Sequence, residues 1–499
     1  MSKLTLVALV AAIGAAAASP MWDYVHTPDP HYSYYDTGIR YNNDTDSTWT
    51  GYLLNVTSQA WLNDTFITRS IWTHQLVVIV PKTIRFNNYA GLYITGSSNT
   101  DGPPSNSSED ILLSAILAET NGIVTASLFQ IPNAPIVFSN DPSQDKRGED
   151  ALVAWSWHNF LMDQNNPENI VFFPMVKAAV RALDTIADFA PKHAPVNIEK
   201  FLVAGASKRG WTTWFVGAVD DRVMAMTPIV MDMLNFTEGV KHMYRAYGGW
   251  TFAFKDYWAV NITQDLADPA LMAALSTYVD ALNYKENMTM PKLVVDATGD
   301  EFFMPDDDYY WWGELPGETY RLMIANAEHS MATGLLTLIP SISAFYEAIM
   351  TDTPRPKFDW VMDQTTGQIT VTTETQPSKV IMRYATTYGD TRRDFRLVKG
   401  DTPQDPCTFI PVKIFGTACI NPVLWAGEAI APVSSDDNTY KYVLNQPLPP
   451  SGWRAFLGEL HFPGPNGQDF IFTTQVSIIP NTFPFEDCAT EAQCKGFLV

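Results

Sequence analysis

The sequence predicts an α/β protein in which a doubly wound, mostly parallel sheet is followed by a C-terminal β-sandwich. Near-continuous apolar runs of strand length recur between residues 74 and 326. A helical apolar pattern lies among them at 174–190, and after about residue 355 the apolar period changes to two. Unbroken apolar strands are typical of a parallel sheet that helices cover on both faces, whereas period-two strands are typical of a sandwich.

The chain begins with a pattern typical of a secretory signal peptide. Lys3 precedes an apolar run from Leu4 to about Ala18, and the run ends in small residues. This run is shorter than the roughly 20 residues that cross a bilayer. We therefore expect a signal peptide at 1–18, a secreted, extracellular protein, and no membrane span in the mature chain.

The net charge of the chain limits the classes of molecule that it is expected to bind. The chain has 32 Lys and Arg against 54 Asp and Glu, which gives a formal net charge of −22. Nucleic acid and anionic membrane surfaces would repel such a protein, so we expect neither as a partner. The eight histidines are scattered, and neither Cys-x-x-Cys nor His-Glu-x-x-His spacing occurs. The sequence therefore predicts no metal site and no cofactor.

Two further patterns agree with secretion. Asn-x-Ser/Thr occurs at seven asparagines, which predicts a glycoprotein surface: Asn43, Asn55, Asn63, Asn106, Asn235, Asn261 and Asn287. The four cysteines all lie in the last fifth of the chain, where an oxidising compartment favours two disulfides. The local pairing is Cys407 with Cys419 and Cys488 with Cys494, although the spacing leaves the connectivity open.

The predicted elements follow in chain order. Residues 20–70 show no clear period, so we expect an irregular segment that packs on the body. The strand-like runs then lie at 74–81, 89–96, 122–132, 200–206, 223–230, 291–299 and 319–326. Apolar residues three and four apart predict an amphipathic helix at 174–190 that covers the sheet.

An insertion and a change of pattern complete the domain prediction. Residues 231–290 interrupt the alternation with a long, aromatic, partly helical stretch, which predicts a cap or lid over the end of the sheet. We place this α/β domain at 19–354. Residues 355–499 contain short period-two runs between Gly, Pro and Asp turns, which predicts a separate β-sandwich domain.

The stretch "VAGASKRG" at 203–210 places Ser207 where a strand ends and an amphipathic run begins. In an α/β-hydrolase the nucleophilic serine needs this strand–turn–helix corner, which exposes its oxygen at the carboxyl edge of the sheet. The common pattern is Gly-x-Ser-x-Gly, but here Arg209 takes the place of the second glycine and Gly210 follows. The alternative is that Ser207 is an ordinary helix N-cap.

The order of the acid and the histidine favours the nucleophile. This fold places the acid and then the histidine after the serine, on loops that follow later strands. Asp300 follows the strand "KLVVDATG", and His329 follows the strand "YRLMIAN". We therefore predict a triad in which His329 removes the proton of Ser207 and Asp300 orients the imidazole. A helix-start histidine without chemistry is the alternative for His329.

Rival acids and the oxyanion hole complete the predicted site. Glu301 and Asp306 could also supply the carboxylate, but Asp300 lies closest to the strand end, and the Asp306–Asp308 run fits a solvated turn. The oxyanion hole needs two N–H donors. One would be the amide of Lys208, and the other would come from Gly96 or Ser97, after the strand at 89–96.

These residues resemble a known family. "GASKRGWTTW", "DATGDEFFMPDD", "NAEHSM" and "TTGQITVTTETQPSKV" are similar to the PhoPQ-activated pathogenicity-related family, which includes the autocrine proliferation repressor proteins. The resemblance covers most of the chain. It implies a secreted α/β-hydrolase fold with Ser207, Asp300 and His329 as the triad. It also implies growth-restraining extracellular signalling or a dipeptidyl-peptidase-like activity, although this chain shows no propeller domain.

Three functions stay open at this point. The first is a secreted serine hydrolase, a peptidase or esterase that acts on a peptide or ester through an acyl-enzyme. The second is a secreted signal or binding protein on a hydrolase scaffold, with a cell-surface receptor or a secreted protein as its partner. The third is a carbohydrate-linked ester hydrolase, because the serine corner is similar to that of glucuronoyl esterases and the chain has many Trp and Tyr, including "YYWW" at 309–312.

Overall fold

The structure is a computed structural model of the whole chain, and it describes residues 20–406, 411–412, 418–436 and 439–499. The predicted signal peptide at 1–18 and Cys407 lie outside the described residues. The pairing of Cys407 with Cys419 therefore stays a prediction. No helix in the described part of the chain is long and apolar enough to cross a membrane.

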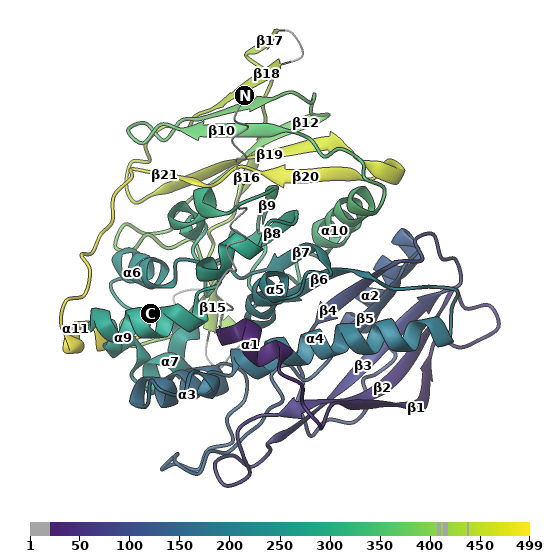
Figure 1. Cartoon of the computed structure of the whole chain (residues 1–499). Coiled ribbons are helices and arrows are strands. Elements are labelled where there is room, and N and C mark those ends of the chain that lie inside the picture. Colours follow the sequence, from purple (N-terminus) through teal and green to yellow (C-terminus); the bar gives the residue numbers. More distant parts are fainter. Residues whose placement is uncertain (1–19, 407–410, 413–417, 437–438) are drawn as a thin grey trace, which may run out of the picture.

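A mixed, mostly parallel sheet forms the centre of the molecule (Figure 1). Its strands from the N-terminal edge lie in the order β1-β2-β3-β5-β4-β6-β7-β8-β9. The last six strands in this order, from β5 through β4 to β9, run parallel. Their bounds are β1 Ser33–Tyr41, β2 Trp49–Ala60, β3 Ile71–Pro81, β4 Tyr89–Ile94, β5 Val124–Leu128, β6 Lys200–Ala206, β7 Val223–Ile229, β8 Lys292–Ala297 and β9 Thr319–Ile324. Each strand-like run between 74 and 326 forms one of these strands, although β3 pairs antiparallel with β5.

The prediction of an irregular segment at 20–70 was wrong. Helix α1 (Pro20–His26) is followed by β1 and β2, which extend the sheet as antiparallel strands. The edge strand β1 is exposed along most of its length, so it carries no apolar face. In β2 the register shifts between Thr57 and Gln59, and this irregularity breaks the period-two pattern that would have indicated a strand.

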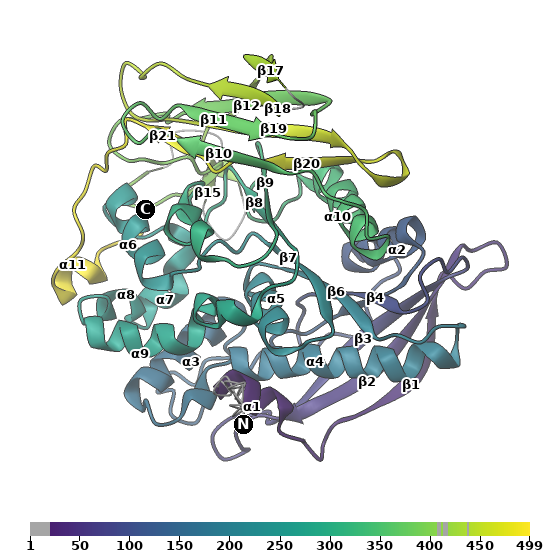
Figure 2. The same ribbon diagram turned by 45° about the horizontal axis from the view of Figure 1, so that its top comes forward.

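Helices cover both faces of the sheet. On one face α1, α4 (Phe172–Phe189) and α5 (Lys208–Val219) pack together, and α4 covers all but the last residue of the helix predicted at 174–190. On the other face α2 (Glu109–Asn121) lies beside α10 (Leu335–Met350), as Figure 2 shows. Apolar side chains of both layers meet the strands in two large buried clusters, as expected for a doubly wound sheet.

The insertion at 231–290 lies between β7 and β8 and is largely helical. It contains α6 (Phe236–Tyr247), α7 (Lys255–Ala259), α8 (Ile262–Asp265) and α9 (Pro269–Val279). Helix α7 contacts α3 (Glu149–Met162), which precedes α4 in the chain. The insertion therefore packs against helices of the central domain, and its role as a lid stays a prediction.

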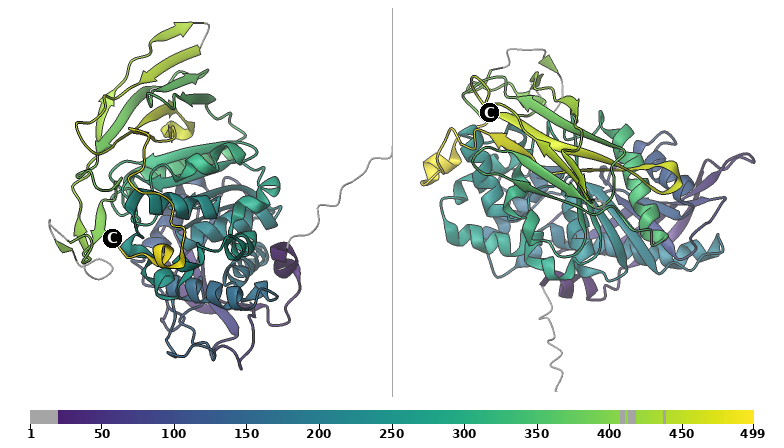
Figure 3. Two further views of the ribbon diagram at one scale, coloured as in Figure 1. Left: turned by 90° about the vertical axis from the view of Figure 1, so that its left-hand side faces the viewer. Right: turned by 90° about the horizontal axis from the view of Figure 1, so that it is seen from above.

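The C-terminal strands form two layers at the top of the molecule in Figure 1, and Figure 3 shows them from two other sides. One layer, β20-β19-β12-β16, joins the central sheet at β9, while β10-β11-β18-β17 form a second sheet. Their bounds are β10 Phe358–Met362, β11 Ile369–Thr373, β12 Lys379–Thr386, β16 Ala426–Ala429, β17 Ser434–Asp436, β18 Thr439–Leu444, β19 Arg454–Pro463 and β20 Asp469–Thr473. One apolar cluster links these strands to α10, so a separate sandwich domain is not confirmed.

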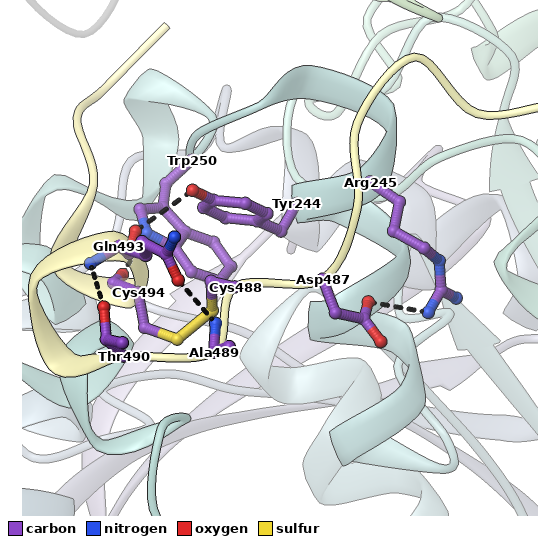
Figure 4. Close-up of a disulfide and its surroundings, with 9 residues drawn as sticks. All are labelled: Tyr244, Arg245, Trp250, Asp487, Cys488, Ala489, Thr490, Gln493 and Cys494. Carbon is purple, nitrogen blue, oxygen red and sulfur yellow. Dashed lines mark hydrogen bonds and ion pairs between the residues drawn. A yellow bond between two sulfur atoms is a disulfide. The ribbon is translucent and has the colours of Figure 1, made fainter.

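A C-terminal tail returns from these strands to the insertion. It contains α11 (Glu491–Lys495), which contacts α8, and Cys488 forms a disulfide with Cys494 at this helix. In Figure 4 the disulfide lies beside Trp250, whose indole N–H donates to the Cys494 carbonyl oxygen at 2.8 Å. The backbone N–H of Trp250 donates to Phe497 O, and Val499 N–H donates to Trp250 O. The tail thus holds the segment between α6 and α7 in place.

Candidate active site

Ser207 occupies a sharp corner between β6 and α5. Its backbone has φ 58° and ψ −128°, a conformation that L-residues other than glycine rarely adopt. Such strain persists only where the surrounding structure enforces it, and it is a feature of the nucleophile position in α/β-hydrolases. The side chain is partly exposed. Ser207 is therefore held as a presented hydroxyl rather than as an ordinary helix N-cap, and its hydroxyl makes no cap hydrogen bond within the described structure.

Close backbone approaches explain both glycines of the corner. A Cβ on Gly205 would lie 2.6 Å from the carbonyl oxygen of Arg209, and one on Gly210 would lie 2.8 Å from Cβ of Met231. The side chain of Arg209 lines the cavity at Ser207 and ties α5 to two neighbouring segments, because it donates to Ile131 O and to Glu149 Oε1, both at 2.5 Å. The departure from Gly-x-Ser-x-Gly therefore leaves the corner intact, with the second close contact moved by one residue.

Three predicted residues meet at the carboxyl edge of the sheet. His329 Nε2 lies 2.8 Å from Ser207 Oγ, and His329 Nδ1 lies 2.9 and 2.8 Å from the two carboxylate oxygens of Asp300. The backbone N–H groups of Phe302 and Phe303 donate to Asp300 Oδ1 at 2.7 and 3.1 Å, which fixes this carboxylate. The parallel strands β6, β8 and β9 deliver the three side chains to one edge from positions far apart in the chain.

Burial and charge act on His329 in opposite directions. Its burial disfavours the imidazolium, but the charge of Asp300 and the hydrogen bond to it outweigh burial, so the pKa of His329 is raised above its ordinary value. The ring also packs on Phe302, with centroids 4.4 Å apart. A histidine in this environment is suited to hold a proton taken from the serine.

The two rival acids have other contacts. Glu301 accepts from the backbone N–H of His329 at 2.9 Å, and burial together with the charge of Asp300 raises its pKa to about 7. Asp306 is ion-paired with Arg393 at 2.6 Å and lies 3.5 Å from His242. The prediction of a solvated turn at Asp306–Asp308 was wrong: all three aspartates are buried, because cationic side chains from other elements pair with this run.

The candidate oxyanion donors lie around Ser207. Lys208 is the first residue of α5, so its N–H has no partner within that helix. Gly96 follows β4 and lines a cavity of about 520 Å³ together with Ser207, Lys208 and His329. Among the described residues the lining of this cavity does not include Ser97, whose hydroxyl is buried. Gly96 therefore fits the second donor better than Ser97 does.

The glycosylation candidates differ in exposure. Five are exposed, while two are half-buried: Asn43, Asn63, Asn106, Asn261 and Asn287 in the first group, Asn55 and Asn235 in the second. The side-chain nitrogen of Asn235 donates to Tyr310 O at 3.0 Å, a bond that a glycan on this atom would disrupt. All seven stay predictions. Within the described part of the chain, no cluster of His, Cys, Asp and Glu is arranged to hold a metal ion.

Sequence reasoning missed a buried charge cluster beside the site. The side chain of Arg321 in β9 is fully buried and lies 3.1, 3.4 and 2.9 Å from carboxylate oxygens of Asp232, Asp296 and Asp308. Burial raises the pKa of all three acids, to about 7 for Asp296 and about 6 for Asp308. The available signal was an arginine inside the apolar strand "YRLMIAN", since a buried guanidinium requires acidic partners.

These raised pKa values predict that mild acid stabilises the fold. Between about pH 5 and 8 the folded state binds protons at Asp296 and Asp308 that the unfolded chain, with ordinary carboxyl pKa values near 4, does not bind. The free energy of unfolding should therefore rise by about 1 kcal/mol or more as the pH falls from 8 to 6. Thermal unfolding at both pH values checks this, and Asp296→Asn should flatten the dependence. An unfolding temperature that rises with pH over this range would contradict it.

Most of the chain matches one protein family. Residues 21–396 match the family described as PhoPQ-activated pathogenicity-related protein. The chain is 35% identical over 509 residues to autocrine proliferation repressor protein A of Dictyostelium discoideum, covering 99% of this chain and 97% of that protein. The resemblance found in the sequence is thereby confirmed.

Similar solved structures include esterases and a peptidase. An acetyl xylan esterase from a Paenibacillus species is 13% identical with a TM-score of 0.43, covering 64% of this chain and 92% of that chain. A second, from a Thermoanaerobacterium species, is 13% identical with a TM-score of 0.44, covering 67% and 92%. A puromycin-hydrolysing peptidase of Mycobacterium tuberculosis is 16% identical with a TM-score of 0.36, covering 56% and 37%. The family match and the full-length relative carry the assignment: the chain belongs to the PhoPQ-activated pathogenicity-related protein family.

Proposed function

We propose that this chain is a serine hydrolase that cleaves an ester or a peptide through an acyl-enzyme on Ser207. The observation that carries the proposal is the hydrogen-bonded series from Ser207 Oγ through His329 to Asp300, built on a serine with positive φ. A hydroxyl is a weak nucleophile unless an adjacent base takes its proton. The 2.8 Å contact between Nε2 and Oγ supports His329 in this role.

The proposed reaction has two halves. Ser207 Oγ attacks the substrate carbonyl carbon while its proton moves to His329 Nε2, and the N–H groups of Lys208 and Gly96 stabilise the oxyanion. The bond to the leaving group breaks, and Nε2 returns the proton to that group. Water then attacks the acyl-enzyme by the same route, which releases the acid and restores Ser207. Asp300 keeps the proton of the neutral ring on Nδ1 and stabilises the imidazolium.

A fluorophosphonate probe tests this proposal. Such a probe reacts with activated serine hydroxyls, so the folded wild-type protein should become labelled and Ser207→Ala should lose the label completely. Ser330→Ala is the matched control, because Ser330 is exposed and lines the same cavity. It should be labelled like the wild type. The proposal fails if the folded wild-type protein takes up no probe, or if Ser207→Ala is labelled equally.

A secreted signal that restrains growth is the second candidate. The observation that favours it is 35% identity over nearly the whole chain to a protein named as an autocrine proliferation repressor. A fold does not decide between signalling and catalysis. In a proliferation assay on cells that respond to the wild-type protein, an active Ser207→Ala protein would assign the signal to binding. An inactive but folded one would make signalling depend on the chemistry.

A further inference from the structure

Two cavities of different character meet at Ser207. The larger one, described above and called the open cavity, is lined by several charged side chains besides apolar ones. The other, the apolar cavity, is smaller and has a largely apolar lining, and it also reaches Ser207 and Lys208. We propose that the apolar cavity receives the acyl part of the substrate, so that this enzyme acts on esters or amides of aliphatic, uncharged acids. This inference rests on the proposed function and names the substrate class for it.

The insertion supplies most of the wall of the apolar cavity. Met231 and Met233 lie at its start, Val240 comes from α6, and Met272 comes from α9. Trp157 of α3 and Trp211 of α5 close the side towards the central domain. Aromatic side chains give a large apolar contact area, and methionines adapt to groups of different shape. Such a wall excludes a charged acyl group, because it offers few partners for the charge.

The position of His329 assigns the two cavities to the two parts of the substrate. His329 lines the open cavity, whereas the lining of the apolar cavity, among the described residues, includes Ser207 but not His329. The general acid must reach the leaving group in order to protonate it. The leaving group therefore lies in the open cavity beside His329. The acyl part, on the other side of the attacked carbon, then lies in the apolar cavity.

A polar boundary separates the two spaces. Lys208 Nζ lies 3.0 Å from Glu149 and 3.2 Å from Asp150, and the hydroxyl of Tyr257 donates to Asp150 at 3.1 Å. Asp150 and Lys208 line both cavities, whereas Glu149 lines the open one. The ion pairs are thus concentrated on the leaving-group side. This boundary favours a polar leaving group and an apolar acyl chain in one substrate.

The C-terminal tail supports one wall of the apolar cavity. Trp250 lines the cavity, and its backbone and indole are bonded to Phe497, Val499 and Cys494 of the tail, as Figure 4 shows for Cys494. Trp250 is fully buried. The cavity is therefore built before substrate arrives and does not depend on the substrate to order this side.

The proposed reaction takes place at the acyl carbon of the substrate, where the two cavities meet beside Ser207. The acyl carbon bonds to Ser207 Oγ while its bond to the leaving oxygen or nitrogen breaks, and the serine proton passes through His329 Nε2 to that atom. Water completes the turnover by supplying OH to the acyl carbon and a proton to His329. No oxidant, reductant or further reactant takes part. The acyl chain stays in the apolar cavity through both halves.

The first test compares p-nitrophenyl acetate, butyrate and hexanoate with the wild-type protein. Each methylene that moves from water into the cavity is worth about fourfold in kcat/KM, so butyrate should exceed acetate by about 15-fold. Hexanoate should exceed acetate at least as strongly. Equal or falling kcat/KM values along the series would overturn the inference.

Two variants change the cavity in opposite directions. Val240→Phe fills the space, so it should lower kcat/KM for hexanoate at least tenfold and leave acetate within twofold. Met272→Ala enlarges the space and should shift the preference towards hexanoate. Lys241→Phe is the matched control, since this neighbour in α6 pairs with Glu238 and is more than a third exposed. It should behave like the wild type. A Val240→Phe protein that is folded and keeps the wild-type preference would overturn the inference.

A binding measurement separates this inference from the proposed function. Ser207→Ala protein is titrated with hexanamide and with acetamide, and the fluorescence of the tryptophans that line the cavity is followed. Tighter binding of hexanamide than of acetamide, lost when Val240→Phe is added, supports the assignment of the apolar cavity to the acyl part. This holds even if the wild-type protein takes up no fluorophosphonate, a result that would overturn the proposed function alone. If the wild-type protein is labelled but shows no preference for hexanamide or for longer esters, the proposed hydrolase function stands. The inference that the apolar cavity receives the acyl part is then overturned.

Discussion

Asp300→Asn is expected to lower the rate of fluorophosphonate labelling by about 10⁴, although the protein stays folded. A carboxylate accepts the proton on Nδ1 of His329 and so leaves Nε2 free to accept the proton of Ser207. An asparagine amide can donate to Nδ1 and so favour the opposite tautomer, in which Nε2 carries the proton. The hydroxyl at 2.8 Å from Nε2 would then face a donor instead of a base.

Glu301→Gln is the matched comparison for this prediction. Glu301 is the neighbouring buried acid and contacts His329 through the backbone N–H at 2.9 Å, whereas Asp300 contacts the ring. The amide oxygen of Gln can still accept that bond, so we expect a loss of tenfold or less. The second-order rate constant of labelling measures both variants without a known substrate. A larger loss for Glu301→Gln than for Asp300→Asn would assign the acid to Glu301.

The parts of the site that the sequence predicted share one physical reason. In a parallel sheet the residues that follow each strand meet at one edge, so a serine, an acid and a histidine after three apolar runs could be placed together. The burial of Asp306–Asp308 could not be found in this way, because Arg393 and Arg321 come from distant segments. Arg321 stands out within its apolar strand, but the sequence does not say which acids pair with it. The tail contacts of Trp250 likewise depend on a return of the chain over more than 240 residues.

The fold shows the same division between local and long-range information. Long apolar runs such as 200–206 predicted their strands because burial on both faces leaves a strong local signal. Strand β1 is a mostly exposed edge strand, and its pairing with β2 decides its structure. The junction of β20 with β9 is similarly a product of packing: Phe472 stacks on Tyr320 with ring centroids 4.3 Å apart. No period within either strand indicates that the two sheets join.

Arg321→Met is expected to destabilise the protein by about 3–5 kcal/mol at neutral pH, the usual cost of leaving buried charges without their partner. The guanidinium lies within 3.4 Å of three carboxylates whose side chains are almost fully buried. Methionine fills much of the same volume but cannot offset any of this charge. The carboxylates must then either remain charged in an apolar site or bind protons, and both outcomes oppose folding at pH 7.

The pH dependence makes this prediction specific. Without Arg321, the folded-state pKa values of Asp232, Asp296 and Asp308 should rise further, so the folded variant gains more stability from protonation than the wild type as the pH falls from 8 to 6. The loss measured by chemical denaturation should therefore be smaller at pH 6 than at pH 8. Arg40→Met is the control: the Arg40 side chain pairs with Asp36 while 25% exposed, so it should cost less than about 1 kcal/mol at either pH. Equal losses for the two variants would show that the cluster is not held by Arg321.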